Sequence, residues 1–307
     1  MVFFITGASS FIGVELCRYL SDNGQEVIAM SRRANENLEE IAKRGYLEFF
    51  IADMHTLPKL AKDIKADVFV HLAWAGTTHD ERNNPAVQEE NVRLSLECVK
   101  LAKRMGVKLY VDAGSQAEYG IVPGVITEET ECHPFSAYGK AKLKMYERSL
   151  DLTAELGMKY IHLRILSVYG ENDHSDTLIM TSLLKLKNNE SVEMRSGGQK
   201  WNYVYVKDAA RQMAELSLNA YDNNSFKNDV YNIASEDTRT LSDFIIAMKG
   251  IIGSSSELKF GGYDPKRDVN LNPDVKKTKE IVMPLSNMMF ESFIKEISPK
   301  CPIGACK

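Results

Sequence analysis

The strongest constraint on the fold is a strand, a turn and a helix near the N-terminus. Residues 2–5 form a short apolar run, and the turn after it consists of the small residues Thr6-Gly7-Ala8-Ser9-Ser10. Over residues 11–20 the apolar side chains then recur at helical spacing. Further strands are expected over residues 26–30, 47–51, 68–72 and 108–112, with helical stretches between them. This alternation predicts an α/β fold with a doubly wound parallel sheet, whose ligand crevice lies at the carboxyl ends of the strands.

The alternation weakens after about Gly170. A helix is expected over residues 177–187, followed by the turn Gly197-Gly198 and scattered short segments. We therefore expect residues 1–170 to form the sheet domain and residues 171–307 a smaller lobe that is interleaved with it. Because no repeat or low-complexity linker separates them, the two parts are expected to share one packed body.

Composition excludes several classes of partner. The 307 residues are 44% hydrophobic, enough to bury a full core, and the formal net charge of -4 comes from interspersed acids and bases. No basic surface is offered to a nucleic acid, and no apolar run approaches the roughly 20 residues of a membrane span. The apolar start is too short for a signal peptide, so a cytoplasmic protein is expected. The five cysteines show no metal-ligand spacing, which predicts reduced thiols and no metal site.

The N-terminal turn has the composition of a phosphate cradle. Gly7, Ser10 and Gly13 lie between the first strand and the first helix, with a serine where a glycine often stands. Small residues allow a close approach to the backbone, and free N–H groups at a helix start bind pyrophosphate. An ordinary strand-to-helix turn is the alternative, but the position on the first strand favours a dinucleotide. The expected cofactor contacts in this turn are Gly7, Ser9, Ser10, Phe11, Ile12 and Gly13.

The end of the second expected strand bears on the choice of dinucleotide. A carboxylate at this place accepts hydrogen bonds from the adenosine ribose of NAD, but the sequence reads Ser31-Arg32-Arg33. Two guanidinium groups suit a 2′-phosphate, so NADP (NADPH) is favoured over NAD, although a solvated pair of arginines is the alternative. Asp53, after the third strand, could accept from the adenine amino group or cap a helix. Met54 is expected to line the same cleft.

Three further residues predict an oxidoreductase. Tyr138 and Lys142 are four residues apart and share a face if they lie on a helix. A tyrosine with its ordinary pKa of about 10 is a poor proton shuttle at neutral pH, and a neighbouring ammonium lowers that pKa. Ser115, just after the fifth strand, can hydrogen-bond the same oxygen. Each feature alone could be a surface pair or a capping serine, so the prediction depends on their order along the chain.

Taken together, these segments resemble the extended short-chain dehydrogenase/reductase family, whose members are nucleotide-sugar epimerases, dehydratases and reductases. The resemblance is carried by residues 6–13, His71-Leu72-Ala73, Ser115 with Tyr119-Gly120, the stretch from Tyr138 to Lys142, and residues 164–170, 201–209 and 230–234. It covers most of the chain. It implies a Rossmann-type NAD(P)-binding domain over residues 1–170 and a substrate-binding lobe over residues 171–307. It also implies that Ser115, Tyr138 and Lys142 are catalytic and that Tyr138 and Lys142 contact the cofactor as well. Further cofactor contacts are implied for Leu72, Ala73, Trp74, Asn91 and Ile165.

The family's chemistries differ in the residues that follow the catalytic serine. Its dehydratases place Asp-Glu there, and its GDP-sugar epimerase-reductases carry a cysteine base two residues after the serine. This chain has Gln116-Ala117, which disfavours both reactions. The resemblance leaves 4-epimerisation with NAD and net reduction of a 4-keto sugar by NADPH. The arginine pair favours the reductase, so we expect reduction of a nucleotide-linked 4-keto-6-deoxyhexose, with a 4-epimerase as the alternative. Residues 114–120 and 169–173 further resemble the reductases that make CDP-abequose or dTDP-6-deoxyhexoses.

The resemblance also implies substrate contacts. Gln116 follows the catalytic serine, Ser167 stands where relatives often have asparagine, and Asn202 stands where they often have aspartate. Arg267 either meets the nucleotide diphosphate or belongs to a solvated loop.

Two expectations concern assembly and the competing class of protein. The helical stretches over residues 91–105 and 137–156 carry apolar faces, and in this family the corresponding pair forms a dimer interface. A homodimer is therefore expected, although burial against the sheet is the alternative. A non-catalytic dinucleotide sensor is the competing class, since a fold can persist without its activity. The presence of Ser115, Tyr138 and Lys142 together favours the enzyme.

Overall fold

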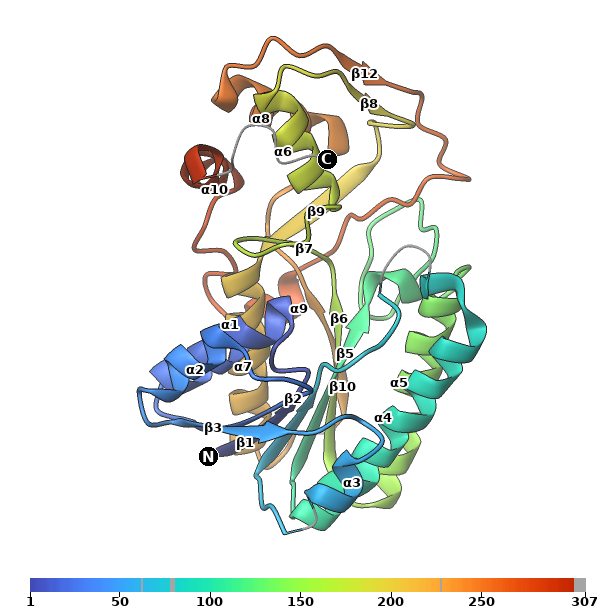
Figure 1. Ribbon diagram of the computed structural model, residues 1–307. Helices are drawn as coiled ribbons and strands as arrows, with labels where there is room; N and C mark the ends of the chain where they lie inside the picture. Colours follow the sequence, from blue (N-terminus) through green and yellow to red (C-terminus); the bar gives the residue numbers. More distant parts are fainter. Residues whose placement is uncertain (62, 78–80, 227, 301–307) are drawn as a thin grey trace.

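The computed structural model describes residues 1–61, 63–77, 81–226 and 228–300. Within these ranges seven strands form one parallel sheet in the order β10-β6-β5-β4-β1-β2-β3 (Figure 1). Its strands are β1 (Val2–Thr6), β2 (Glu26–Ser31), β3 (Leu47–Ile51), β4 (Val68–His71), β5 (Leu109–Ser115), β6 (Lys159–Ile165) and β10 (Asp229–Ile233). The sequence-based prediction of a doubly wound parallel α/β sheet is thus confirmed.

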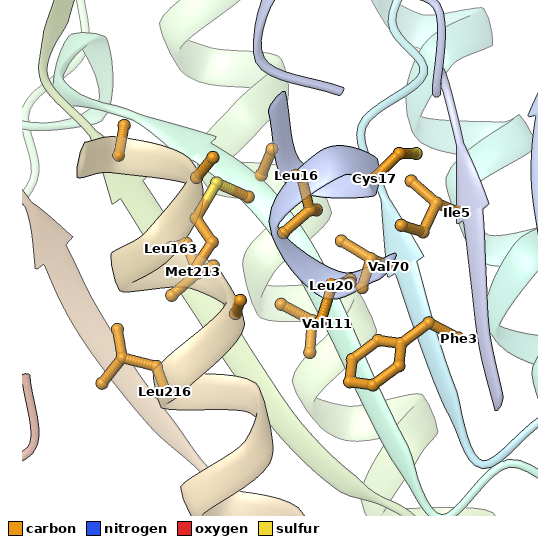
Figure 2. Packing of buried hydrophobic residues seen from close by; sticks show 14 of the residues in the cluster. Phe3, Ile5, Leu16, Cys17, Leu20, Val70, Val111, Leu163, Met213 and Leu216 are labelled. Atoms are coloured by element: carbon orange, nitrogen blue, oxygen red, sulfur yellow. The ribbon is translucent and has the colours of Figure 1, made fainter. Parts of the chain in front are cut away.

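Helices cover both faces of this sheet because its strands are apolar on both faces. One face carries α1 (Phe11–Asp22), α2 (Glu36–Ala42) and α7 (Val206–Asp222). Figure 2 shows side chains of α1 and α7 meeting the strand residues Phe3, Val70 and Val111. The opposite face carries α3 (Leu57–Leu60), α4 (Pro85–Met105) and α5 (Ala137–Glu155), which pack over Phe4 and Phe69. No helix in the described ranges is both long and apolar enough to cross a membrane.

The smaller lobe is built from short strands and helices around an aromatic cluster. A three-stranded sheet joins β7 (Ser167–Tyr169), β9 (Lys200–Tyr205) and β11 (Thr238–Thr240), and β8 (Val192–Met194) pairs with β12 (Leu258–Phe260). The helices are α6 (Leu178–Lys187), α8 (Leu241–Ile252) and α10 (Phe290–Ile297), whereas α9 (Lys276–Lys279) packs against β10 of the main sheet. Within this cluster the ring of Phe244 packs edge to face against the rings of Tyr203 and Phe290. The helix expected over residues 177–187 is α6, with Thr177 as its N-cap.

The chain crosses between the two parts more than once. Both α7 and β10 follow residue 170, yet α7 packs against α1 and β10 pairs with β6 at the edge of the main sheet. A single division at residue 170 therefore does not separate the sheet domain from the lobe. Among the described cysteines, Cys17, Cys98 and Cys132 are free thiols, whereas Cys301 and Cys306 lie outside the described residues.

The N-terminal turn is packed so closely that two of its glycines cannot carry a side chain. Gly7 has a φ of +70°, and a Cβ there would lie 2.7 Å from the backbone nitrogen of Ala73 at the end of β4. A Cβ on Gly13 would lie 2.4 Å from the carbonyl oxygen of Gly7. Because the obstructing atoms are backbone, side-chain rotation cannot relieve either contact.

Gly13→Ala is therefore expected to destabilise the protein by roughly 1–3 kcal/mol, as overpacking usually does. It should also weaken binding of the dinucleotide, because the turn must move. Chemical denaturation and a cofactor titration measure the two effects. Gly250→Ala is the matched control, since no atom lies within 4 Å of a Cβ in that turn of α8. The control should be neutral or stabilising, because alanine is the better helix former. Equal stability of the two variants would contradict the tight packing at Gly13.

Candidate active site

A cleft of about 880 Å³ lies at the carboxyl ends of the central strands, where a parallel sheet places its ligand site. Most of the cofactor contacts expected from the sequence line it: Gly7, Ser9, Ser10, Phe11, Ser31, Arg32, Asp53, Met54, Leu72, Ala73, Trp74 and Asn91. The lining also includes residues that the sequence analysis missed: Asn35, Asn37, His55, Glu171, Asn172 and His174. Asn35 caps α2 and Asn37 lies in its first turn, whereas the others lie on the loops after β3 and β7. Of these residues only Glu171 and Asn172 belong to a segment, residues 169–173, that the resemblance had singled out.

Six expected cofactor residues do not line this cleft, and two of them, Tyr138 and Lys142, lie against the lining residue Trp74. Gly13 contributes through its missing side chain, and Ile12 packs its side chain against the hydrophobic core. Arg33 is exposed beside the lining residue Arg32. Ile165 is buried in the sheet, in register with Ser115 on β5.

The residues of the turn fit a dinucleotide. Ser10 is the N-cap of α1, and its Oγ accepts a hydrogen bond from the N–H of Gly13 at 3.1 Å. The serine in the place of a glycine is thus explained as a helix cap. A helix leaves its first N–H groups without intrahelical partners, and Ser10 satisfies only one of them. The positive end of α1 lies at the cleft, where its free N–H groups can bind a pyrophosphate. The turn that carries it is tightly packed, with no room for a Cβ at Gly7.

The side chains of the two arginines after β2 are free to bind a ligand. Both side chains are exposed, and neither makes an ion pair or a hydrogen bond with any other described residue. The Ser31 hydroxyl donates to the carbonyl oxygen of Arg33 at 2.5 Å, which fixes the turn that carries them. Arg32 lines the cleft at the end where the adenosine of a dinucleotide would lie.

Asp53 and Asn91 shape the cleft through backbone contacts. One oxygen of Asp53 accepts from the N–H groups of His55 and Thr56 at 2.8 and 2.9 Å. The Thr56 N–H in particular holds the pKa of the Asp53 carboxyl below its usual value. One of the two oxygens thus closes the turn before α3, whose N-cap is Thr56 and not Asp53. The side-chain amide of Asn91 both accepts from and donates to the backbone of Ala75, at 3.0 and 2.8 Å. It holds the loop after β4 in place.

Ser115, Tyr138 and Lys142 come together beside Trp74, a residue of the cleft wall. Ser115 ends β5 and caps the short helix η2 (Gln116–Glu118), while Tyr138 and Lys142 lie one turn apart at the start of α5. Burial raises the pKa of Tyr138, whereas Arg82 and a hydrogen bond from the Ser115 hydroxyl act in the opposite direction. In the protein alone the phenol therefore keeps its proton at neutral pH, as a proton donor requires.

Lys142 is held between an aromatic face and a backbone carbonyl. Its Nζ lies 3.6 Å from the ring centroid of Trp74 and donates to the carbonyl oxygen of Ala113 at 2.6 Å. The Trp74 indole is braced in turn by a hydrogen bond from its Nε1 to Gln88 at 2.9 Å. Burial lowers the pKa of Lys142 to about 8, even though the charges of Asp112 and Glu118 raise it.

This pKa predicts an alkaline limit for catalysis. The Lys142 ammonium is present below about pH 8 and is lost as the pH rises through that value. We expect kcat to fall above about pH 8, because the cation that stabilises the Tyr138 phenolate disappears. A kcat–pH profile measures this, and Lys142→Met should remove the step at this pH along with most of the activity. A wild-type profile that stays flat to pH 10 would show that the Lys142 ammonium is not required.

The sequence analysis missed one cation in the site. Arg82, in the short helix η1 (Glu81–Asn83), places its guanidinium carbon 4.3 Å from the ring centroid of Tyr138. Its charge lowers the pKa of that phenol. A charged turn before a helix usually is a solvated surface, so the sequence carried no signal for this contact.

The four expected substrate residues differ in their surroundings. Gln116 follows Ser115 in η2 and Ser167 begins β7, and both side chains are partly exposed.

The expectation that Asn202 contacts the substrate is corrected by the structure. Asn202 is fully buried, and its amide donates to the Ser235 carbonyl at 2.9 Å and to Thr238 Oγ1 at 2.8 Å, so it braces a loop and cannot reach a substrate. Arg267 is 80% exposed beside Asp264 and does not line the cleft, as the solvated-loop alternative describes.

This fold and site define a class: a Rossmann-type sheet with a dinucleotide cleft and a Ser-Tyr-Lys set at its end. The model of the NAD dependent epimerase/dehydratase family matches residues 3–234. The chain belongs to that family and is an NAD(P)-dependent enzyme of the extended short-chain dehydrogenase/reductase type.

Curated relatives and solved structures agree with this assignment. The chain is 27% identical to the dTDP-6-deoxy-L-talose 4-dehydrogenase (NAD(+)) of Aggregatibacter actinomycetemcomitans, over 77% of this chain and 85% of the relative. It is 24% identical to the CDP-abequose synthase of Yersinia pseudotuberculosis, over 89% of this chain and 91% of the relative. The UDP-glucuronic acid 4-epimerase of Bacillus cereus has the same fold, with a TM-score of 0.83 and 19% identity over 97% of this chain and 98% of that chain.

Proposed function

We propose that this enzyme catalyses the NADPH-dependent reduction of a nucleotide-linked 4-keto-6-deoxyhexose to the 4-hydroxy sugar. The arginine pair after β2 is the observation that carries the choice of NADPH. Arg32 and Arg33 replace the carboxylate that NAD requires, and no carboxylate among the described residues neutralises them. The dehydrogenase and the synthase of 6-deoxy sugars among the relatives support the substrate class.

The chain's own residues supply the proton chemistry of this reaction. Tyr138 is the proton donor, and its raised pKa keeps the phenol protonated until the carbonyl oxygen becomes basic. The Ser115 hydroxyl donates a hydrogen bond to the same oxygen as negative charge develops on it. Lys142 and Arg82 then stabilise the phenolate that remains. When bound, the reduced nicotinamide supplies the hydride that the carbonyl carbon accepts.

Dehydration lacks its acid and base here. It requires a group that removes a carbon-bound proton and another that protonates the departing hydroxyl. Neither the Gln116 amide nor the Ala117 methyl can do either. Glu118 is the next carboxylate, but it is fully buried and bonded to the Ser115 N–H, His162 and Arg164. This arrangement favours chemistry confined to oxidation and reduction at one carbon.

The proposal is tested by following NADPH absorbance at 340 nm with CDP-, dTDP-, UDP- and GDP-linked 4-keto-6-deoxyhexoses, in parallel with NADH. We expect stoichiometric consumption of NADPH with one nucleotide sugar, and slower use of NADH. No consumption with any of them would refute the reductase.

A 4-epimerase is the second candidate, favoured by the shared fold of the solved 4-epimerase structures. It would carry NAD through purification and interconvert 4-hydroxyl epimers without net consumption of cofactor. We further propose a cytoplasmic homodimer that pairs through α4 and α5, which pack against each other on one side of the main sheet. Light scattering in solution measures the oligomeric state.

A further inference from the structure

A cluster of buried charged side chains lies directly behind the catalytic serine, and the proposed chemistry does not use it. Asp112 from β5, Glu118 from η2, and His162 and Arg164 from β6 are at most 3% exposed. Burying a charge is costly unless it is paired and hydrogen-bonded. Four such groups in one place therefore need an explanation beyond packing.

The contacts of His162 favour its protonated form. Its Nδ1 lies 2.5 Å from an oxygen of Asp112, and its Nε2 lies 3.0 Å from an oxygen of Glu118. A carboxylate oxygen accepts hydrogen bonds, and only the imidazolium can donate from both ring nitrogens at once. Burial lowers the pKa of His162, but the charges of Glu118 and Asp112 outweigh it and raise this pKa to about 9.

Glu118 connects the imidazolium to the catalytic loop. Its Oε1 accepts a hydrogen bond from the Ser115 N–H at 2.7 Å, while its Oε2 accepts from Arg164 Nε at 3.0 Å. The strand passes over the histidine so closely that a Cβ on Gly114 would lie 2.2 Å from His162 Nε2. The backbone of Ser115 is therefore positioned by a carboxylate that is itself held from three sides.

The rest of the surroundings hold the cluster in place. The Tyr160 hydroxyl donates to the second oxygen of Asp112 at 2.9 Å, and the Tyr146 ring of α5 lies 4.6 Å from the His162 ring. Arg164 also donates to the carbonyl oxygen of Glu128 at 3.1 Å. The ionisable groups that face or surround His162 are thus Asp112, Glu118, Arg164, Tyr160 and Tyr146, with Lys142 close to both carboxylates.

We propose that the protonated His162 is a positioning residue for the reaction: by donating to both Asp112 and Glu118, it holds Ser115 where its hydroxyl meets the phenol of Tyr138. When the ring loses its proton, one carboxylate loses its donor, and Glu118 no longer fixes the Ser115 N–H as firmly. The inference rests on the catalytic role of Ser115. It applies equally to a reductase and a 4-epimerase, since both would use the same serine.

The protonation state is measured by NMR of ¹⁵N-labelled histidine in the full-length protein, with the His162 signal assigned from its loss in His162→Gln. We expect two protonated ring nitrogens at pH 7.5 and a titration near pH 9. A neutral ring at pH 7.5 would overturn the proposal. This measurement needs no substrate, so it stands even if no nucleotide sugar is reduced.

Two near-isosteric variants should move that titration in opposite directions. Glu118→Gln keeps an oxygen for the Ser115 N–H but removes one charge, so His162 should lose its proton below pH 7.5. Tyr160→Phe removes a donor from Asp112, which should hold the His162 proton more tightly and raise the titration above its wild-type value. Shifts in the same direction, or no shifts, would contradict the hydrogen-bond roles assigned here.

Activity separates positioning from structural support. On the low-pH plateau of the kcat–pH profile, where Lys142 stays protonated, Glu118→Gln should lower kcat roughly 10-fold, the factor expected when one buried hydrogen bond weakens in the transition state. The KM for the cofactor should stay unchanged, because no cleft-lining residue is altered.

Asp208→Asn is the matched control: this buried carboxylate of α7 accepts from the Asn287 and Met288 N–H groups, away from the catalytic loop. It should lower thermal stability while leaving kcat and the His162 signal unchanged. A wild-type kcat in Glu118→Gln would contradict the proposal.

Discussion

Tyr138→Phe is expected to lower kcat by at least about 10²-fold, the low end of what general acid catalysis contributes. The phenylalanine keeps the edge-to-face contact with Trp74 and the guanidinium of Arg82 above the ring. What disappears is the phenolic hydroxyl that the Ser115 hydroxyl bonds. Cofactor affinity should be nearly intact, because the cradle at Gly7 and the arginines after β2 are untouched.

Steady-state turnover and a fluorescence titration with NADPH measure these two quantities. Tyr221→Phe is the matched control, since that hydroxyl donates to Asp67 at 3.0 Å, at the opposite end of the strands from the cleft. It should leave kcat unchanged. Turnover in Tyr138→Phe within a few-fold of wild type would rule out Tyr138 as the proton donor.

Replacing Arg32 and Arg33 together by alanine should weaken NADPH binding by about 10²-fold or more, because each hydrogen bond to a charged group contributes roughly 1.5–3 kcal/mol. NADH lacks the 2′-phosphate, so its affinity should change by less than about 3-fold on the same argument. Neither side chain has another partner among the residues that the structure describes, so the fold should be unaffected.

Dissociation constants for both cofactors, measured with the wild-type and the double variant, test this directly. Arg44→Ala is the matched control, because this exposed arginine pairs with Asp22 near the opposite ends of the strands. It should alter neither constant. Equal losses for NADPH and NADH in the double variant would mean that the arginines do not meet a 2′-phosphate.

The sequence predicted the sheet and the cofactor cleft because both depend on local patterns. The pattern of a strand, a small-residue turn and a helix that starts at Phe11 lies within a dozen residues, and the structure contains each of these elements. Tyr138 and Lys142 could be paired because a helix brings residues four apart to one face. In these cases the spacing along the chain determines the spacing in space.

What the sequence did not reveal depends on contacts between distant segments. Arg82 lies 56 positions before Tyr138, and Glu118 lies 44 positions before His162; only the fold brings them together. Asn202 differs from these cases, because the family resemblance implied a substrate contact, whereas its side-chain amide makes its hydrogen bonds to residues 235–238. The sequence alone does not show whether the side-chain amide of an asparagine is buried or exposed.

The return of α7 and β10 to the main sheet limits how this enzyme can acquire new substrates. A fragment that ends at residue 170 would leave β6 as an open edge and would uncover the apolar face of α1. Recombination therefore cannot exchange the lobe as an independent unit, because the same segment of chain completes the main sheet. New specificity has to arise from substitutions in the loops that meet the cleft, while the chain continues to complete its own sheet.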